Sequence, residues 1–290
     1  MSGRRVQRVL QVNGLHMGVT LSGAHDTSRT LVLLHGFTGS ASGWGDLLTD
    51  LALPGMRIVA LDMLGHGQSD APADPQRYTM ERCQADIIEA LVQLGIAPGE
   101  AILLGYSMGG RIALYCAFSG FFRALILESA SPGLADPTER AHRRASDEEL
   151  AARIERDGVA AFVDYWEHIP LFASQRNLPA EKRAALHEQR LHNRAVGLAN
   201  SLRGVGTGAQ PALHERLPEL NLPVLLIAGD SDTKFCAIAQ QMAQRLPQAQ
   251  LRIVPGAGHT VHLEQPAAFV ALIKQFWHSL VVAGGIEAIK

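Results

Sequence analysis

The stretch Ala101-Ile102-Leu103-Leu104-Gly105-Tyr106-Ser107-Met108-Gly109-Gly110-Arg111 has the pattern of a buried strand, a tight turn and the start of a helix. Its turn contains Gly-x-Ser-x-Gly, the spacing of a nucleophile elbow, in which a serine on strained backbone projects above the end of a sheet. The first helical turn offers free N–H groups and the positive end of the helix dipole beside Ser107. Gly and Ser are common in turns, so the motif indicates catalysis only if the chain supplies a base, an acid and an oxyanion hole.

Length and composition describe an ordinary globular chain. Its 290 residues are enough for one large domain or for a core with an inserted subdomain. The net charge of −2 gives no indication of nucleic acid or an anionic membrane as a partner. Three scattered cysteines predict neither a disulfide framework nor a metal site, and they favour a reducing compartment. No apolar run is long enough to span a membrane, and Gln7, Gln11 and Asn13 interrupt the N-terminal apolar stretch. We therefore expect a cytoplasmic protein without a secretory leader.

Strands alternate with helices over most of the chain, which predicts a mostly parallel sheet covered on both faces. The chain begins with an expected antiparallel hairpin, Val6–Val12 and Leu15–Leu21, around Asn13-Gly14. Further predicted strands are Thr30–Leu34, Met56–Leu61, Ala101–Leu104, Ala124–Leu127, Val224–Ile227 and Gln250–Val254. The predicted helices between and after them are Trp44–Leu51, Met80–Leu94, Gly110–Ser119, Phe235–Leu246 and Pro266–Leu280.

This alternation stops between about Pro132 and Pro218, where the sequence has charge-rich helical stretches and no convincing strand. The expected helices there are Thr138–Arg156, Val159–Glu167, Pro179–Asn193 and Ala195–Leu202. We therefore predict a core formed by residues 1–132 and 219–290, with an α-helical cap at residues 133–218 inserted between two strands.

An acid and a base follow Ser107 in the loops after two later strands, Gly229-Asp230-Ser231-Asp232 and Gly256-Ala257-Gly258-His259. Parallel strands end at one edge of a sheet, so both loops should lie beside the elbow. His259 would accept the Ser107 proton, and a buried carboxylate would orient its imidazole. We prefer Asp232 as this acid because it lies deeper in the loop, with Asp230 as the alternative. His262 is the alternative base.

Two backbone N–H groups complete the expected site. The loop His35-Gly36-Phe37 follows an earlier strand, where one oxyanion donor is expected, so Phe37 and Met108 are the predicted pair. We expect His35 to brace this loop and His66 to have a structural role in Gly65-His66-Gly67. The chain order of serine, acid and histidine, with this loop, predicts the α/β-hydrolase fold.

Arg111 is an unusual residue for this position. It follows Ser107 by four residues and so lies on the same helix face, where the helix dipole disfavours a cation. One explanation is a structural ion pair, for which Glu128 is a candidate partner. The other is a clamp for an anionic substrate, because a guanidinium matches a carboxylate in two hydrogen bonds.

Several further segments carry a more specific likeness. They are Glu128–Leu134; Arg140, Arg143 and Ser146-Asp147; Trp166; Pro170-Leu171-Phe172; Arg190 and Asn193; Ser201–Gly208; Asp232-Thr233-Lys234-Phe235; and Gly258–His262. Together with the elbow and Arg111, they resemble the 2-succinyl-6-hydroxy-2,4-cyclohexadiene-1-carboxylate synthases of menaquinone and phylloquinone biosynthesis. The resemblance covers roughly Leu31 to Phe276. The elbow with its arginine and the Asp-x-Lys-Phe element are its more specific parts.

The resemblance implies a lyase on a hydrolase scaffold, which eliminates pyruvate from a small polycarboxylate substrate without a metal or an organic cofactor. It places the catalytic triad on Ser107, Asp232 and His259. It places the residues that hold the substrate on Tyr106, Arg111, Arg143, Trp166 and Arg190. Ser107, activated by His259, would act as the base that abstracts a proton, not necessarily as an acylated nucleophile.

Two other functions stay open at this stage. A carboxylesterase or a carbon–carbon bond hydrolase would use the same triad, and only the arginines and the Asp-x-Lys-Phe element argue against it. A non-catalytic ligand receptor on this scaffold is the second alternative, against which the complete triad argues. The oligomeric state, the mobility of the cap and the carboxylate held by each arginine do not follow from the sequence.

Overall fold

The computed structural model describes residues 5–24 and 27–283. Its strands are β1 (Val6–Val12), β2 (Leu15–Gly23), β3 (Thr30–Leu34), β4 (Arg57–Leu61), β5 (Ala101–Tyr106), β6 (Phe122–Glu128), β7 (Val224–Gly229) and β8 (Ala249–Val254). They form one eight-stranded sheet in the order β1-β2-β4-β3-β5-β6-β7-β8. The pairs β1–β2 and β2–β4 are antiparallel, and the other pairs are parallel.

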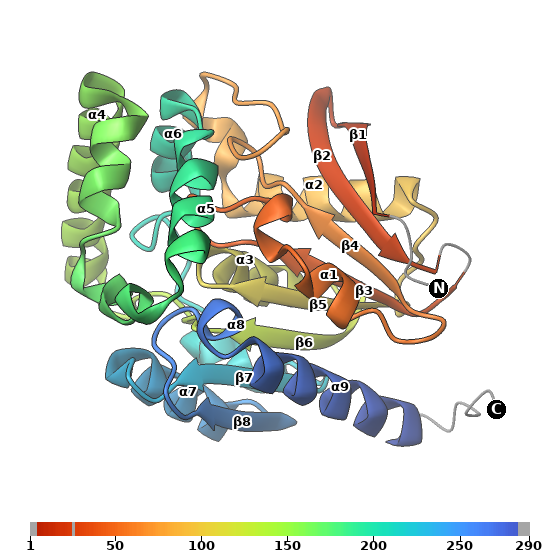
Figure 1. The fold of residues 1–290 in the computed structure, drawn as a ribbon. Coiled ribbons are helices and arrows are strands. Elements are labelled where there is room, and N and C mark those ends of the chain that lie inside the picture. Colours follow the sequence, from red (N-terminus) through yellow and green to blue (C-terminus); the bar gives the residue numbers. More distant parts are fainter. Residues whose placement is uncertain (1–4, 25–26, 284–290) are drawn as a thin grey trace.

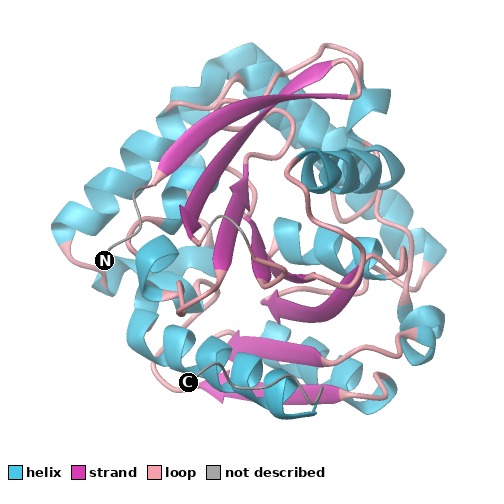
Figure 2. Cartoon of the chain, turned by 90° about the vertical axis from the view of Figure 1, so that its right-hand side faces the viewer, coloured by secondary structure: helices cyan, strands magenta, loops and turns pink. Residues whose placement is uncertain are grey.

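The helices are α1 (Leu47–Asp50), α2 (Met80–Gln93), α3 (Met108–Ala117), α4 (Pro137–Trp166), α5 (Ala180–Leu191), α6 (Ala195–Val205), α7 (Thr233–Arg245), α8 (Val261–Glu264) and α9 (Pro266–Ala283). Short 3-10 segments are η1 (Ala41–Trp44), η2 (Pro75–Tyr78), η3 (Pro170–Asn177) and η4 (His214–Glu219). Figure 2 shows helices on both sides of the twisted sheet.

Alternate side chains of the buried strands point to opposite faces of the sheet, and each face has its own apolar core. Val32 and Leu34 of β3 belong to the core that packs against α2, α3 and α7. Leu31 and Leu33 belong to the core that packs against α1 and α9. A mostly parallel sheet with helices on both faces and a helical insertion is the architecture predicted for the α/β-hydrolase fold.

Helices α4, α5 and α6 lie together at one end of the sheet, between β6 and β7 in the chain (Figure 1). They have a separate small core, to which Ile154, Phe162 and Leu198 contribute and against which Phe37 of the sheet loop packs. The two helices predicted over 138–167 are both present within α4, which is interrupted at Gly158, where a φ of 83° and a ψ of 170° are not helical. The boundary of 133–218 for the cap stays a prediction.

One predicted helix is wrong in its form. Instead of a single helix over 44–51, the chain forms η1 and then the single turn α1. The interruption falls at Gly45, whose φ of 49° is incompatible with a right-handed helix. Within the described residues, none of the helices combines the length and the apolar character needed to cross a membrane.

Candidate active site

The elbow is the sharp turn between β5 and α3. Ser107 has a φ of 51°, a left-handed backbone that costs a non-glycine residue free energy and that recurs at functional sites. Its N–H donates to the Glu128 carbonyl at 2.8 Å, which fixes the turn against the end of β6. A Cβ atom on Gly105 or Gly109 would collide with backbone carbonyls, so both positions require glycine. The turn holds the Ser107 hydroxyl above the sheet edge.

Ser107, His259 and Asp232 form a chain of hydrogen bonds. The Asp232 Oδ2 accepts from the His259 Nδ1 at 2.7 Å, and the His259 Nε2 is 3.0 Å from the Ser107 Oγ. Because the carboxylate accepts the Nδ1 proton, Nε2 is the acceptor for the serine hydroxyl. The side chains of His259 and Asp232 are only 1% and 8% exposed. This arrangement can take a proton from Ser107 and stabilise the resulting imidazolium.

Asp232 and Asp230 lie in different surroundings. The Asp232 Oδ1 also accepts from the Phe235 N–H at 3.2 Å, so the residue caps α7 while it faces His259. Asp230 is exposed, and its Oδ1 accepts from the Gly256 N–H at 3.0 Å. Of the two acids, the structure therefore brings Asp232 to the histidine and leaves Asp230 in the loop beside it.

The predicted oxyanion donors lie at the same place. Phe37 and Met108 both line the cavity that contains Ser107. Met108 is the first residue of α3, so its N–H has no acceptor within the helix. Within residues 5–24 and 27–283, neither of these two N–H groups donates a hydrogen bond. Both are available to a substrate oxygen.

His35 braces the oxyanion loop. Its Nε2 accepts from the Met63 N–H at 3.0 Å, and its Nδ1 donates to the Gly36 carbonyl at 2.8 Å. These bonds require the neutral imidazole, and burial lowers the pKa of His35 in the same direction. Burial also lowers the pKa of His66 to about 3, and the His66 ring lies 5.0 Å from the His35 ring. Both histidines support the loop.

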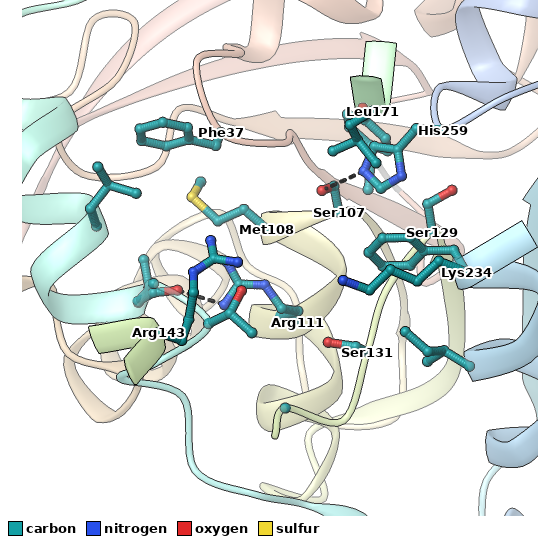
Figure 3. A pocket seen from close by; sticks show the side chains of 18 of the residues that line it. Phe37, Ser107, Met108, Arg111, Ser129, Ser131, Arg143, Leu171, Lys234 and His259 are labelled. Carbon is teal, nitrogen blue, oxygen red and sulfur yellow. Dashed lines mark hydrogen bonds between the residues drawn. The ribbon is translucent and has the colours of Figure 1, made fainter. Parts of the chain in front are cut away.

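The cavity at Ser107 has a volume of about 330 Å³ (Figure 3). Apolar rings form much of its wall: Phe37, Trp166, Phe172 and Phe235. The rings of Phe235 and Phe172 lie 4.6 and 6.0 Å from the His259 ring. The polar part of the cavity wall consists mainly of hydroxyl groups and cations, namely Tyr106, Arg111, Ser129, Ser131, Arg143, Ser201, Thr207 and Lys234.

Arg111 projects into this cavity beside Arg143 (Figure 3). Its Nη1 donates to the Val205 carbonyl at 2.6 Å and to the Gln210 Oε1 at 3.3 Å. No carboxylate lies within 4.0 Å of this guanidinium anywhere in the described part of the chain. Burial, and secondly the charge of Arg143, lower the pKa of Arg111 to about 10. It stays charged at neutral pH, and an anion in the cavity would stabilise it.

Glu128 is not the partner of Arg111, contrary to the structural alternative considered from the sequence. Its carboxylate is fully buried and accepts from the His262 Nδ1 at 2.8 Å and from the His262 N–H at 3.0 Å. Arg111 points toward α6 instead, because a side chain on the first turn of α3 faces the cavity and the cap. The same contacts hold His262 behind the elbow, away from the Ser107 hydroxyl.

The other predicted substrate residues fall into two groups. Tyr106, Arg143 and Trp166 line the Ser107 cavity. The Tyr106 hydroxyl bonds to the Thr260 Oγ1 at 3.0 Å, and burial raises its pKa. Arg143 is half-exposed and pairs with Asp147 at 2.7 Å, one turn further along α4.

Arg190 is the exception, because it lines two neighbouring cavities and not the one that contains Ser107. It is buried, and it pairs with Glu167 at 2.9 Å. Its guanidinium lies 5.3 Å from the centroid of the Phe172 ring. Phe172 lines all three cavities and so separates Arg190 from the Ser107 cavity.

Five polar residues of the cavity were not among the predicted site residues, namely Ser129, Ser131, Ser201, Thr207 and Lys234. All of them lie in segments that carry the resemblance, Glu128–Leu134, Ser201–Gly208 and Asp232-Thr233-Lys234-Phe235, so the sequence held a signal although no role was assigned to these residues. The described residues contain no group of three or more His, Cys, Asp or Glu side chains that could hold a metal ion, in this cavity or outside it.

The chain is similar in sequence and in structure to known proteins. Residues 31–272 match the model of the alpha/beta hydrolase family. A Bacillus subtilis protein provisionally named 2-succinyl-6-hydroxy-2,4-cyclohexadiene-1-carboxylate synthase is 47% identical over 88% of this chain and 92% of its own length. The Serratia proteamaculans protein of that name is 36% identical over 85% and 92%. The solved structure of MenH from S. aureus matches with a TM-score of 0.85 at 32% identity, and the match covers 90% of this chain and 98% of that one.

Proposed function

Since the chain belongs to the 2-succinyl-6-hydroxy-2,4-cyclohexadiene-1-carboxylate synthases of menaquinone biosynthesis, within the alpha/beta hydrolase family, we propose that it is a lyase that works through Ser107, His259 and Asp232. The substrate would be 2-succinyl-5-enolpyruvyl-6-hydroxy-3-cyclohexene-1-carboxylate, from which pyruvate is eliminated.

The names of substrate and product define the bonds that change. A proton leaves C2, next to the succinyl carbonyl, and its electron pair forms the C2–C3 double bond. The C3–C4 double bond moves to C4–C5, and the C5–O bond breaks. The leaving group is the enolate of pyruvate, which takes up one proton to become pyruvate. No electrons are gained or lost, so the reaction needs only a base, a site for the transient oxyanion and an acid.

The serine and the histidine supply the base in this proposal. His259 takes the hydroxyl proton of Ser107 through the 3.0 Å contact, and the Ser107 oxygen abstracts the C2 proton. Asp232 stabilises the imidazolium that forms. His259 then holds the proton that the pyruvate enolate requires. Ser107 forms no acyl bond in this scheme, because the substrate offers no ester or amide for it to cleave.

The oxyanion hole follows from the same chemistry. Loss of the C2 proton places negative charge on the succinyl oxygen. The free N–H groups of Phe37 and Met108 would donate to this oxygen, and the apolar rings around it would keep out water and strengthen these bonds.

Charge supports an anionic substrate. Arg111 and Arg143 line the cavity, and the Arg111 guanidinium lacks an acidic partner among the described residues. Tyr106 and Trp166 would contact the ring of the substrate. Arg190 would support the wall through Phe172, and direct contact with the substrate would require Phe172 to move. The observation that carries the proposal is a serine–histidine pair that opens onto a cavity with an unpaired, part-buried arginine.

The test is release of pyruvate from the enolpyruvyl substrate, followed with a coupled lactate dehydrogenase, and the mass of the intact protein during turnover. We expect one pyruvate for each diene formed, and no increase in the mass of the protein. Hydrolysis of p-nitrophenyl esters with an acyl adduct on Ser107, and no pyruvate release, would instead identify a carboxylesterase.

A further inference from the structure

Ser129 is a buried hydroxyl that the fold does not use. It is 2% exposed and lines the Ser107 cavity. Within the described ranges, its Oγ has no hydrogen-bond partner. Its φ of 48° is the left-handed region, and its N–H donates to the Ile227 carbonyl at 2.9 Å. An unsatisfied buried hydroxyl and a strained backbone each destabilise the fold, and together they indicate a ligand group that the hydroxyl would bind.

Lys234 is a cation that faces the same cavity. It lies in the first turn of α7, where the helix dipole disfavours positive charge, and no carboxylate of the described chain lies within 4.0 Å of its amine. Figure 3 shows the Lys234 amine directed into the cavity toward the side on which Arg111 lies. The side chain is exposed, so this cation stands at the mouth of the cavity, whereas Arg111 is deeper.

The topology brings the two residues to one side of the cavity. Ser129 follows β6, and Lys234 follows β7, its parallel neighbour in the sheet. In the register Glu128↔Ile227, β6 ends two residues before β7, which ends at Gly229, so both strands end at the same edge of the sheet. A hydroxyl donor and an ammonium are thus presented together, as the partners of a carboxylate.

The position of Ser129 and Lys234 suggests a more detailed account of how the substrate binds, and this account rests on the proposed function. The substrate carries three carboxylates, on the ring, on the succinyl chain and on the enolpyruvyl group, of which the product keeps the first two. We propose that Ser129 and Lys234 form the subsite for the enolpyruvyl carboxylate. The group that departs must reach solvent, and Lys234 is the cation at the mouth that has no acidic partner in the described chain. There its charge also stabilises the enolate that leaves C5.

Binding separates this subsite from the other cations. In an inactive Ser107→Ala background, the dissociation constants of substrate and product are measured by calorimetry, with and without Lys234→Met. We expect substrate binding to weaken about 10-fold, as for loss of a charged hydrogen bond, and product binding to change less than about twofold. Lys182→Met, on α5 and outside this cavity, is the matched control and should change neither constant.

Ser129 gives a second test with a readout that a structural role would not produce. Ser129→Gly removes the hydroxyl and relieves the left-handed strain. We expect it to raise the melting temperature while it weakens substrate binding about threefold to 10-fold, again with product binding unchanged. Ser129→Ala should weaken substrate binding equally, with a smaller gain in stability, because it removes the unpaired hydroxyl but keeps the left-handed backbone strain.

Two results of the binding measurements on Lys234→Met would contradict the proposed subsite. Equal weakening of substrate and product by Lys234→Met would assign Lys234 to a carboxylate that stays, and unchanged binding of both would remove it from the site. Either result overturns the subsite. Failure of the proposed function would give a different result, because the unaltered enzyme would then release no pyruvate.

Discussion

Two histidine–carboxylate pairs lie beside the elbow residue Tyr106, and they differ in the surroundings of the imidazole ring. His259 and His262 are three residues apart, and each bonds through Nδ1 to a carboxylate, Asp232 at 2.7 Å and Glu128 at 2.8 Å. The Nε2 of His259 faces the Ser107 hydroxyl. The His262 ring instead packs between Trp44 and Tyr106, at 4.7 and 4.8 Å.

The difference shows that a buried carboxylate beside a histidine does not by itself make a general base. Asp232 and His259 lie on loops at the carboxyl ends of strands, where the sheet edge opens into a cavity. Glu128 is the last residue of β6 and lies under the elbow, so its pair joins α8 to the sheet. In the proposed function, the pair of His259 serves the chemistry and the pair of His262 serves stability, and variants can separate these roles.

The largest effect should follow from Ser107→Ala. The pair of His259 and Asp232 stays in place, but the oxygen that we propose to abstract the proton is lost, so kcat for pyruvate release should fall about 10³-fold or more. The melting temperature should stay the same or rise, because the left-handed backbone at position 107 is no more strained with alanine than with serine. Pyruvate release at the unaltered rate would exclude Ser107 as the base.

Next in size is the structural pair. Glu128→Gln leaves His262 without its carboxylate in a buried position, and the free energy of unfolding should fall by about 3 kcal/mol. Because neither Glu128 nor His262 lines the Ser107 cavity, kcat for pyruvate release should change less than about 10-fold. Urea denaturation and the pyruvate assay measure the two quantities. Glu219→Gln, in an exposed pair with Arg216, is the control and should cost under about 1 kcal/mol.

Arg111 extends the comparison from paired to unpaired charge. Arg111→Leu removes the deep cation, so KM for the anionic substrate should rise about 10- to 100-fold, as for loss of a charge-assisted hydrogen bond. Stability should increase slightly, because a part-buried guanidinium without an acidic partner among the described residues is removed. Arg252→Leu, on exposed β8, controls for net charge. An unchanged KM would mean that Arg111 only supports the cap through its bond to the Val205 carbonyl.

The smallest effect concerns His66, a buried histidine without any carboxylate partner in the described chain. Its pKa is lowered to about 3, whereas an unfolded chain protonates near its ordinary value of 6.5. Below pH 6.5 the unfolded state therefore binds more protons, and stability falls as the pH decreases toward 3. Between pH 7 and 5.5 the loss attributable to His66 should be about 1 kcal/mol. His66→Asn should reduce the slope of unfolding free energy against pH, and an unaltered slope would contradict the assignment.

Much of the fold was accessible from the sequence because it depends on local patterns. The strand Thr30–Leu34 was predicted with the bounds that the structure has, since its apolar run ends at a Gly-rich loop. The proximity of Ser107, Asp232 and His259 followed from one rule, that parallel strands end at one edge of the sheet. A 3-10 turn in place of a helix near Gly45 was not accessible, because the positive φ of one glycine decides it.

What the sequence did not provide are contacts between distant segments. Glu128 and His262 are separated by 134 positions, and no local pattern links them. Arg190 reads as an arginine of an exposed helix, but the fold buries it behind Phe172. Ser129 and Lys234 emerge as neighbours of one cavity only when β6 and β7 are paired in register. Such features depend on packing, which composition and periodicity do not encode.

The central claim is that the pair of His259 performs the chemistry and the pair of His262 does not. The most direct measurement is kcat for pyruvate release by His259→Gln and His262→Gln, made side by side on folded protein at one pH. We expect His259→Gln to lose about 10³-fold or more and His262→Gln less than about 10-fold. Equal losses in the two variants, or the larger loss in His262→Gln, would contradict the account.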